Sequence, residues 1–136
     1  MFSLIWLWWT VVLYWIQKSN AVIQSYTLVI TREILPGFNG LRVAVNGSSP
    51  GPQISVILGN TVRITVINGI FDDSTSIHWH GMELRNTPWM DGLINVTQCP
   101  ISNQFGNNTF VYEFTPTIAG TFWYHGHYHS QSPDGK

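Results

Sequence analysis

Apolar and polar residues alternate along five stretches of this chain, and this period of two is the strongest constraint on its fold. Residues two apart point to the same face of a β-strand, so each stretch predicts a strand buried on one face. The repeating apolar positions are Tyr26, Leu28 and Ile30; Leu41, Val43 and Val45; Ile54, Val56 and Leu58; Val62, Ile64 and Val66; and Phe110, Tyr112 and Phe114.

Turn-forming residues separate these stretches. Pairs such as Pro36-Gly37, Asn46-Gly47 and Asn68-Gly69 interrupt the alternation about every ten residues, as is typical of β-sandwiches and barrels. Between residues 25 and 114 the apolar residues show no convincing helical period. The chain length of 136 residues is that of a single domain. We therefore predict an all-β Greek-key sandwich or barrel.

Charged residues make up only 10% of the chain, and the formal net charge is -1. A nucleic-acid-binding surface needs Lys and Arg gathered on one face, and this chain has only six such residues in all. The composition therefore argues against a nucleic-acid partner.

The N-terminal residues form an apolar block that ends before Gln17. The block is shorter than the roughly 20 residues that span a bilayer, so it predicts the hydrophobic helix of a secretory signal peptide. Ser19 and Ala21 are small residues that place the cleavage after Ala21. The signal then covers residues 1–21 and the domain covers residues 22–136. An uncleaved signal anchor is the alternative, because four tryptophans in the block would suit a membrane interface.

Secretion makes two further features meaningful. Cys99 is the only cysteine, and an odd cysteine in a secreted chain is either a free thiol or the partner of a cysteine on another segment. The chain also carries three acceptor motifs for N-glycosylation. Their asparagines are Asn46, Asn95 and Asn107. We expect an extracellular glycoprotein with no stable membrane span.

All five histidines lie in two short runs, residues 76–81 and residues 120–131. In an extended backbone His78 and His80 share one face, and Trp79 points to the other face. Aromatic residues would then anchor the strand in the core while the imidazoles face away from it.

The second run has the same parity. His125, His127 and His129 share a face, opposite Tyr124 and Tyr128. A single histidine is usually a surface residue or a satisfied core residue, but two His-x-His pairs on rigid strands are the arrangement that a metal site needs. Spacing alone leaves the metal open, because imidazole suits zinc, copper, iron and nickel.

Five motifs resemble, in order and spacing, the first cupredoxin (plastocyanin-like) domain of multicopper oxidases, the family of laccases, ascorbate oxidases and ferroxidases. The motifs are NGSSPGPQI at 46–54, SIHWHGM at 76–82, PWMDG at 88–92, TQCPI at 97–101 and GTFWYHGHYHSQ at 120–131. The resemblance implies a cupredoxin-like fold, copper as the cofactor, and substrate oxidation coupled to reduction of dioxygen to water.

The resemblance also implies roles for single residues. His78 matches a ligand of the type 2 copper in the trinuclear cluster, and His80, His125 and His127 match ligands of the type 3 copper pair. Asp91 matches a carboxylate beside the cluster that takes part in proton delivery, whereas an isolated Asp before Gly would by itself be read as a turn residue. His129 matches no ligand, and its role stays open.

Family members contain several such domains, and the other half of the cluster ligands comes from motifs that this sequence does not contain. The blue copper site, which needs a Cys thiolate and two histidines, has no counterpart either, because no histidine lies near Cys99 in the sequence. In the family a cysteine at this position commonly forms a disulfide with a distant segment, which implies a partner outside this chain. A closing strand normally follows the second histidine run, so we expect the domain to be incomplete at its C-terminal end, with an unpaired sheet edge.

We therefore expect a laccase-like, copper-dependent oxidoreductase by family, whose 136 residues alone are inactive. The implied partners are O2, a small reducing substrate (a phenol, ascorbate or Fe2+) and the further cupredoxin domains. Two alternatives stay open: a non-catalytic secreted copper-binding module, and a half-site that a partner chain completes. The reducing substrate, the oligomeric state and whether the chain is a fragment or a natural short form stay undetermined.

Overall fold

A computed structural model describes residues 22–104 and 106–128 of the chain. The predicted signal helix over residues 1–21 lies outside the described residues. No helix in the described ranges is long and apolar enough to cross a membrane.

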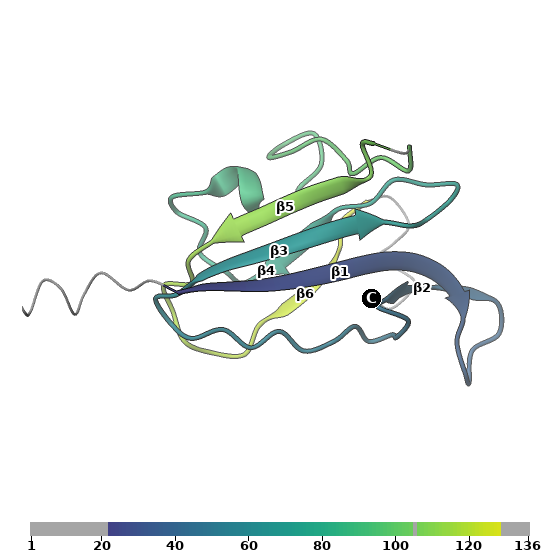
Figure 1. The fold of residues 1–136 in the computed structure, drawn as a ribbon, viewed down its shortest axis with the longest axis horizontal. Coiled ribbons are helices and arrows are strands. Elements are labelled where there is room, and N and C mark those ends of the chain that lie inside the picture. Colours follow the sequence, from purple (N-terminus) through teal and green to yellow (C-terminus); the bar gives the residue numbers. More distant parts are fainter. Residues whose placement is uncertain (1–21, 105, 129–136) are drawn as a thin grey trace, which may run out of the picture.

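The described residues form two β-sheets and no α-helix. One sheet has four strands in the order β2-β1-β3-β5, and the other pairs β4 with β6. Figure 1 shows β1, β3 and β5 side by side in front of β4 and β6. The elements are β1 (Ile23–Ile34), β2 (Leu41–Val45), β3 (Thr61–Asn68), β4 (Ile77–His80), a 3-10 turn η1 (Pro88–Met90), β5 (Thr109–Phe114) and β6 (Trp123–Gly126).

β3 is the centre of the larger sheet. It pairs parallel with β1 and antiparallel with β5, and its residues Val62, Ile64 and Val66 are at most 1% exposed. These apolar positions face the second sheet because side chains two apart on a strand point the same way. The core is formed by Leu28, Ile30, Val43, Val45, Val62, Ile64, Val66, Ile70, Ile77, Trp79, Ile101, Tyr112 and Phe114. The predicted all-β sandwich is thus confirmed.

The strand predicted at Ile54, Val56 and Leu58 does not form. Ile54 and Val56 do pack against the core, but Leu58 is 53% exposed and the backbone of residues 51–57 joins no sheet of the described part. Side chains of β1 hold this segment instead. The Tyr26 hydroxyl donates to the carbonyl oxygen of Ser55, and the backbone N–H of Ile57 donates to the side chain of Gln24. The alternation therefore correctly predicted that Ile54 and Val56 pack against the core, but it wrongly predicted that this segment pairs as a strand.

Leu41 also departs from its predicted place in the core. It pairs with Ile34 at the end of the β1–β2 ribbon. Leu41 is 63% exposed and Ile34 is 73% exposed. The β1–β2 ribbon extends past the second sheet at this point (Figure 1), so these residues have no facing layer.

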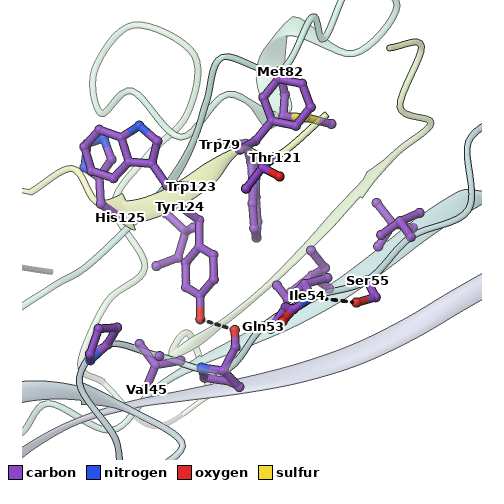
Figure 2. A pocket seen from close by; sticks show the side chains of 18 of the residues that line it. Val45, Gln53, Ile54, Ser55, Trp79, Met82, Thr121, Trp123, Tyr124 and His125 are labelled. Atoms are coloured by element: carbon purple, nitrogen blue, oxygen red, sulfur yellow. Dashed lines mark hydrogen bonds between the residues drawn. The ribbon is translucent and has the colours of Figure 1, made fainter. Parts of the chain in front are cut away.

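The two sheets do not close into a barrel within the described residues. A cavity of about 930 Å³ lies between them, and Figure 2 shows Tyr124 and Trp79 on one side of it and Val45 and Ile54 on the other. Residues of β1, β2, β3, β4, β5 and β6 all contribute to its lining. The expected unclosed sandwich is what the structure contains.

We predict that Tyr112→Phe lowers the free energy of unfolding by about 1–2 kcal/mol, because it leaves a buried donor unpaired. The Tyr112 side chain is fully buried, and its hydroxyl accepts a hydrogen bond of 3.0 Å from the backbone N–H of Ile77. Urea unfolding followed by circular dichroism measures the change. Val111→Thr, at a 41% exposed position of the same strand, is the control and should change the stability by less than about 0.5 kcal/mol. Equal stability of both variants would show that the hydrogen bond does not hold β4.

Candidate metal centre

The two histidine runs meet because β4 and β6 pair antiparallel. The register sets His78 opposite His125 and Trp79 opposite Tyr124. Facing residues of antiparallel strands point to the same side of a sheet. One side of this ribbon therefore carries imidazoles and the other carries aromatic core residues.

The aromatic side fixes the ribbon to the core. The Trp79 ring lies 5.3 Å from that of Tyr112, 5.5 Å from that of Phe114 and 5.9 Å from that of Tyr124, measured between centroids. The Tyr124 hydroxyl donates a 2.9 Å hydrogen bond to the carbonyl oxygen of Pro52, at the far wall of the cavity. Edge-to-face and tilted contacts of this length are favourable for aromatic rings. The backbone beneath the imidazoles is thus held by large, packed side chains.

His78 is the central imidazole of the opposite side. Its ring centroid lies 5.4 Å from that of His80, 5.3 Å from that of His125 and 5.6 Å from that of His127. The potential ligand atoms of His78, His80 and His125 lie within 4.8 Å of one another. The four histidines that the sequence singled out therefore converge in space, three of them tightly.

Hydrogen bonds set which nitrogen the rings of His78 and His125 present. The Nδ1 atom of His78 lies 2.8 Å from the carbonyl oxygen of Asp91, and Nδ1 of His125 lies 2.9 Å from the carbonyl oxygen of Gly126. A carbonyl oxygen can only accept, so both Nδ1 atoms carry the proton. The Nε2 lone pair of each ring is then free to bind a metal, which is how ligating histidines are commonly oriented.

Asp91 and Gly92 bring a loop against β4 at His78. One carboxylate oxygen of Asp91 lies 3.2 Å from Nδ1 of His78, in addition to the hydrogen bond to the carbonyl. Gly92 has a φ of +83°, and a Cβ at this position would overlap the carbonyl oxygen of Ile77. Glycine therefore permits the close approach that places Asp91 beside the imidazole. The sequence identified Asp91, but the requirement for Gly92 came only from the structure.

His127 lies at the rim of the cluster. β6 ends at Gly126, and the backbone N–H of His127 donates a 3.2 Å hydrogen bond to the carbonyl oxygen of Ser76. The side chain is exposed, unlike that of His125, which is 9% exposed. His129 lies outside the described residues.

Burial determines the electrostatics of His125. Burial lowers the pKa of this imidazole below its ordinary value of 6.5, and the neighbouring His78, His127 and His80 lower the pKa further, while the hydrogen bond to Gly126 acts in the opposite direction. A neutral imidazole is the form that binds a metal. The site thus favours the ligating form of His125. The clustering, the freed Nε2 atoms and this neutral form together fit a metal that imidazole suits.

Trp123 also belongs to the site, although neither its motif nor the family resemblance assigned it a role. Its indole stacks on the rings of His80 and His125, at centroid distances of 4.6 Å and 4.3 Å. Strand parity could have identified Trp123, because it lies two residues before His125 and therefore points to the same face of the strand.

The predicted modification sites lie at the surface. Cys99 is exposed, and Asn46, Asn95 and Asn107 are exposed as well. The Asn46 carboxamide is already engaged, since it donates to the carbonyl oxygen of Thr27 and accepts from the backbone N–H of Val29. Disulfide formation by Cys99 and glycosylation of the three asparagines stay predictions.

Comparison with known proteins places these residues in a family. A protein-family model for multicopper oxidases matches residues 31–136. Oxidoreductase ptaE of Pestalotiopsis fici is 42% identical over 123 residues, which are 88% of this chain and 20% of that protein. L-ascorbate oxidase of Brassica rapa subsp. pekinensis is 43% identical over 96 residues, which are 71% of this chain and 16% of that protein.

Solved structures agree with the fold. The crystal structure of laccase from Botrytis aclada matches 85% of this chain and 21% of its own chain, with a TM-score of 0.75 and 36% sequence identity. This chain thus spans about a fifth of the length of these three relatives. The expected cupredoxin-like architecture is confirmed by this likeness.

We predict that His125 titrates below pH 6.5 in the metal-free chain, because burial disfavours its charged form. Below pH 6.5 the unfolded chain binds a proton at His125 that the folded chain still lacks. The free energy of unfolding should therefore fall as the pH decreases from 6.5 to the folded pKa. A 1H–15N NMR titration of the imidazoles measures the pKa, and His125→Gln should remove this part of the pH dependence. Titration of His125 at or above pH 6.5 would contradict the prediction.

We predict that Gly92→Ala destabilises the chain by about 2–4 kcal/mol, because the new Cβ overlaps the backbone of β4 as well as straining φ. Gly47→Ala is the matched control, since Gly47 also has a positive φ, of +76°, but nothing lies within 4 Å of the place that its new Cβ would occupy. The control should cost about 1–2 kcal/mol in urea unfolding. Gly92→Ala should also shift the NMR signals of the His78 ring. Equal costs for the two variants would rule out the close approach.

Proposed function

This chain belongs to the multicopper oxidase family, and on that premise we propose that it is the N-terminal copper-binding domain of a secreted, laccase-like oxidase. In this proposal the chain supplies half of the ligands of a trinuclear copper cluster. The observation that carries it is the convergence of His78, His80 and His125, whose ligand atoms lie within 4.8 Å of one another, with His127 at the rim.

Each histidine has a role in this proposal. His78 is the ligand of the type 2 copper, and its central place among the other three rings supports that role. His80, His125 and His127 are ligands of the type 3 pair. His78 and His80 belong to one run but would serve different copper types, and His125 and His127 would serve the type 3 pair. Each run would then contribute to more than one metal of the cluster.

Asp91 has two tasks in the proposal. Its backbone carbonyl accepts the Nδ1 proton of His78 and so fixes the tautomer of that ring. Its carboxylate, 3.2 Å from the same nitrogen and partly exposed, is placed to take up protons from solvent and hold them beside the cluster. The reduction of dioxygen to water consumes protons as well as electrons, and this is the redox chemistry that bound copper supplies.

Several properties of the whole protein belong to the proposal as well. The reducing substrate is a phenol, ascorbate or Fe2+, and dioxygen is the electron acceptor. The N-terminal residues 1–21 act as a signal peptide, the protein is extracellular and glycosylated, and Cys99 pairs with a cysteine outside this chain. The exposed thiol of Cys99 is accessible to such a partner.

The 136 residues alone should bind copper without turning over substrate. The cluster within the described residues contains histidines but no cysteine, and Cys99 lies in a separate loop after η1. Electron entry from an organic donor through a blue copper site needs a thiolate ligand with two imidazoles. That site would have to come from further cupredoxin domains.

A second candidate is a non-catalytic secreted copper-binding module. The compact group of His78, His80 and His125 favours it, since three imidazoles from one chain can hold a single ion without another domain. This candidate predicts one or two coppers per monomer, held by His78, His80, His125 and His127. A half-site completed by a partner chain predicts instead a dimer that forms only with copper.

The experiment is a titration of the metal-free chain with Cu2+. Calorimetry measures the copper affinity, and electron paramagnetic resonance reports the ligands of the bound Cu2+. We expect His78→Ala, His80→Ala and His125→Ala each to weaken copper binding at least about tenfold, because each removes a ligand. Asn103→Ala, at an exposed position outside the cluster, is the control and should bind copper as the unmodified chain does. Copper binding that survives loss of His78 and His125 together would refute the assignment.

The same sample tests catalysis. The copper-loaded chain is mixed with a phenolic donor in an oxygen electrode, and we expect no sustained oxygen uptake. Sustained uptake that depends on His78 would overturn the claim that further domains are required. The copper stoichiometry and the sedimentation velocity of the loaded chain distinguish a copper-binding module that stays monomeric from a site that a partner chain completes.

A further inference from the structure

Trp123 lies on the metal-facing side of β6, directly opposite His80 of β4. Its ring is stacked on two imidazoles at once, with interplanar angles of 28° to His80 and 24° to His125. Near-parallel rings at centroid distances of 4.3–4.6 Å are in favourable offset-stacking contact. Trp123 is 55% exposed, and the ring contacts that it makes in the described part of the chain are these two imidazoles.

The three rings form a triangle rather than a sandwich. An indole between two imidazoles would separate their centroids by nearly the sum of the two stacking distances. The centroids of His80 and His125 are only 5.7 Å apart, so both rings lie on the same side of the indole. Trp123 is therefore a shared platform that covers one side of two potential ligands.

His80 depends on this platform more than the other ligands do. His78 and His125 each donate their Nδ1 proton to a backbone carbonyl, which fixes the ring plane and the tautomer. The His80 imidazole has no hydrogen bond to any residue in the described part of the chain, and His80 is exposed. The indole of Trp123, at 4.6 Å, is also the nearest ring to the His80 imidazole, since the rings of His78 and His125 lie 5.4 Å and 5.7 Å away. Stacking on Trp123 is thus the closest ring contact that restrains rotation of His80.

We propose that Trp123 is a positioning residue of the metal centre, which holds the His80 ring, and secondarily the His125 ring, in the orientation that binds copper. This inference rests on the proposed function, because it concerns the same cluster. Its physical basis is preorganisation: a ring that is already held in place loses less rotational freedom when the metal binds. Removal of the platform should weaken binding without removing a ligand.

The test compares Trp123→Leu with Trp123→Phe in the full 136-residue chain. Leucine removes the aromatic platform, and we expect Cu2+ to bind about fivefold more weakly, in line with the energy of a stacked pair. Phenylalanine keeps a flat ring, and we expect affinity within about twofold of the unmodified chain. Trp89→Leu is the matched control, because Trp89 is 54% exposed and its ring contacts no other ring in the described residues.

Two further readouts separate positioning from a general loss of structure. The copper spectrum in electron paramagnetic resonance should broaden in Trp123→Leu, because His80 samples several orientations, and should be restored in Trp123→Phe. In the metal-free unmodified chain, the ring current of the indole should move the His80 ring protons upfield. This NMR measurement needs no variant, so it tests the contact even if Trp123→Leu does not fold.

The outcomes distinguish this inference from the proposed function. Copper binding by the unmodified chain, with unchanged affinity and spectrum in Trp123→Leu, overturns the role of Trp123 and leaves the proposed function standing. Absence of the upfield shift of His80 overturns it as well. Failure of the unmodified chain to bind copper overturns both. Weakening in Trp123→Leu that Trp123→Phe restores, with Trp89→Leu unaffected, supports the role.

Discussion

The pairing of β4 with β6, in the register that sets His78 opposite His125, is the interaction on which the rest of the site depends. Side chains on a strand alternate between faces, so a slip by one residue would exchange the imidazoles with the aromatic core residues. The register is strongly specified because Trp79 and Tyr124 on the other face pack into the core. Packing of the apolar face therefore determines the geometry of the polar face.

The loop at Asp91 adds what the ribbon alone cannot provide. A histidine on a strand can rotate about its side-chain bonds, and its tautomer is free unless a partner fixes it. Asp91 supplies that partner for His78, and the close approach at Gly92 makes the contact possible. His125 finds an equivalent acceptor in its own strand, at Gly126. Orientation of the site is thus distributed over a loop, a strand and the Trp123 platform.

Much of the fold and of the site could be predicted from local patterns. Alternation located β3 and β5 correctly, because these strands are buried on one face only. It was wrong for residues 54–58, because alternation reports burial and says nothing about whether a backbone partner is present. It was also wrong for Leu41, because a strand can continue beyond the layer that covers it. The first error concerns a backbone partner and the second a covering layer. Both are supplied by distant parts of the chain, which local sequence does not encode.

The sequence by itself determined the chemistry of this protein: two His-x-His pairs, their shared faces, and the motifs that resemble the multicopper oxidase family. Parity along a strand and spacing of motifs are local properties, so they can be read without coordinates. Only the tertiary structure decided that His78 lies at the centre of the cluster, that His127 lies at its rim, and that Trp123 covers His80. These relations depend on the register between β4 and β6, which lie far apart in the sequence, and on packing that forms only when the two sheets meet.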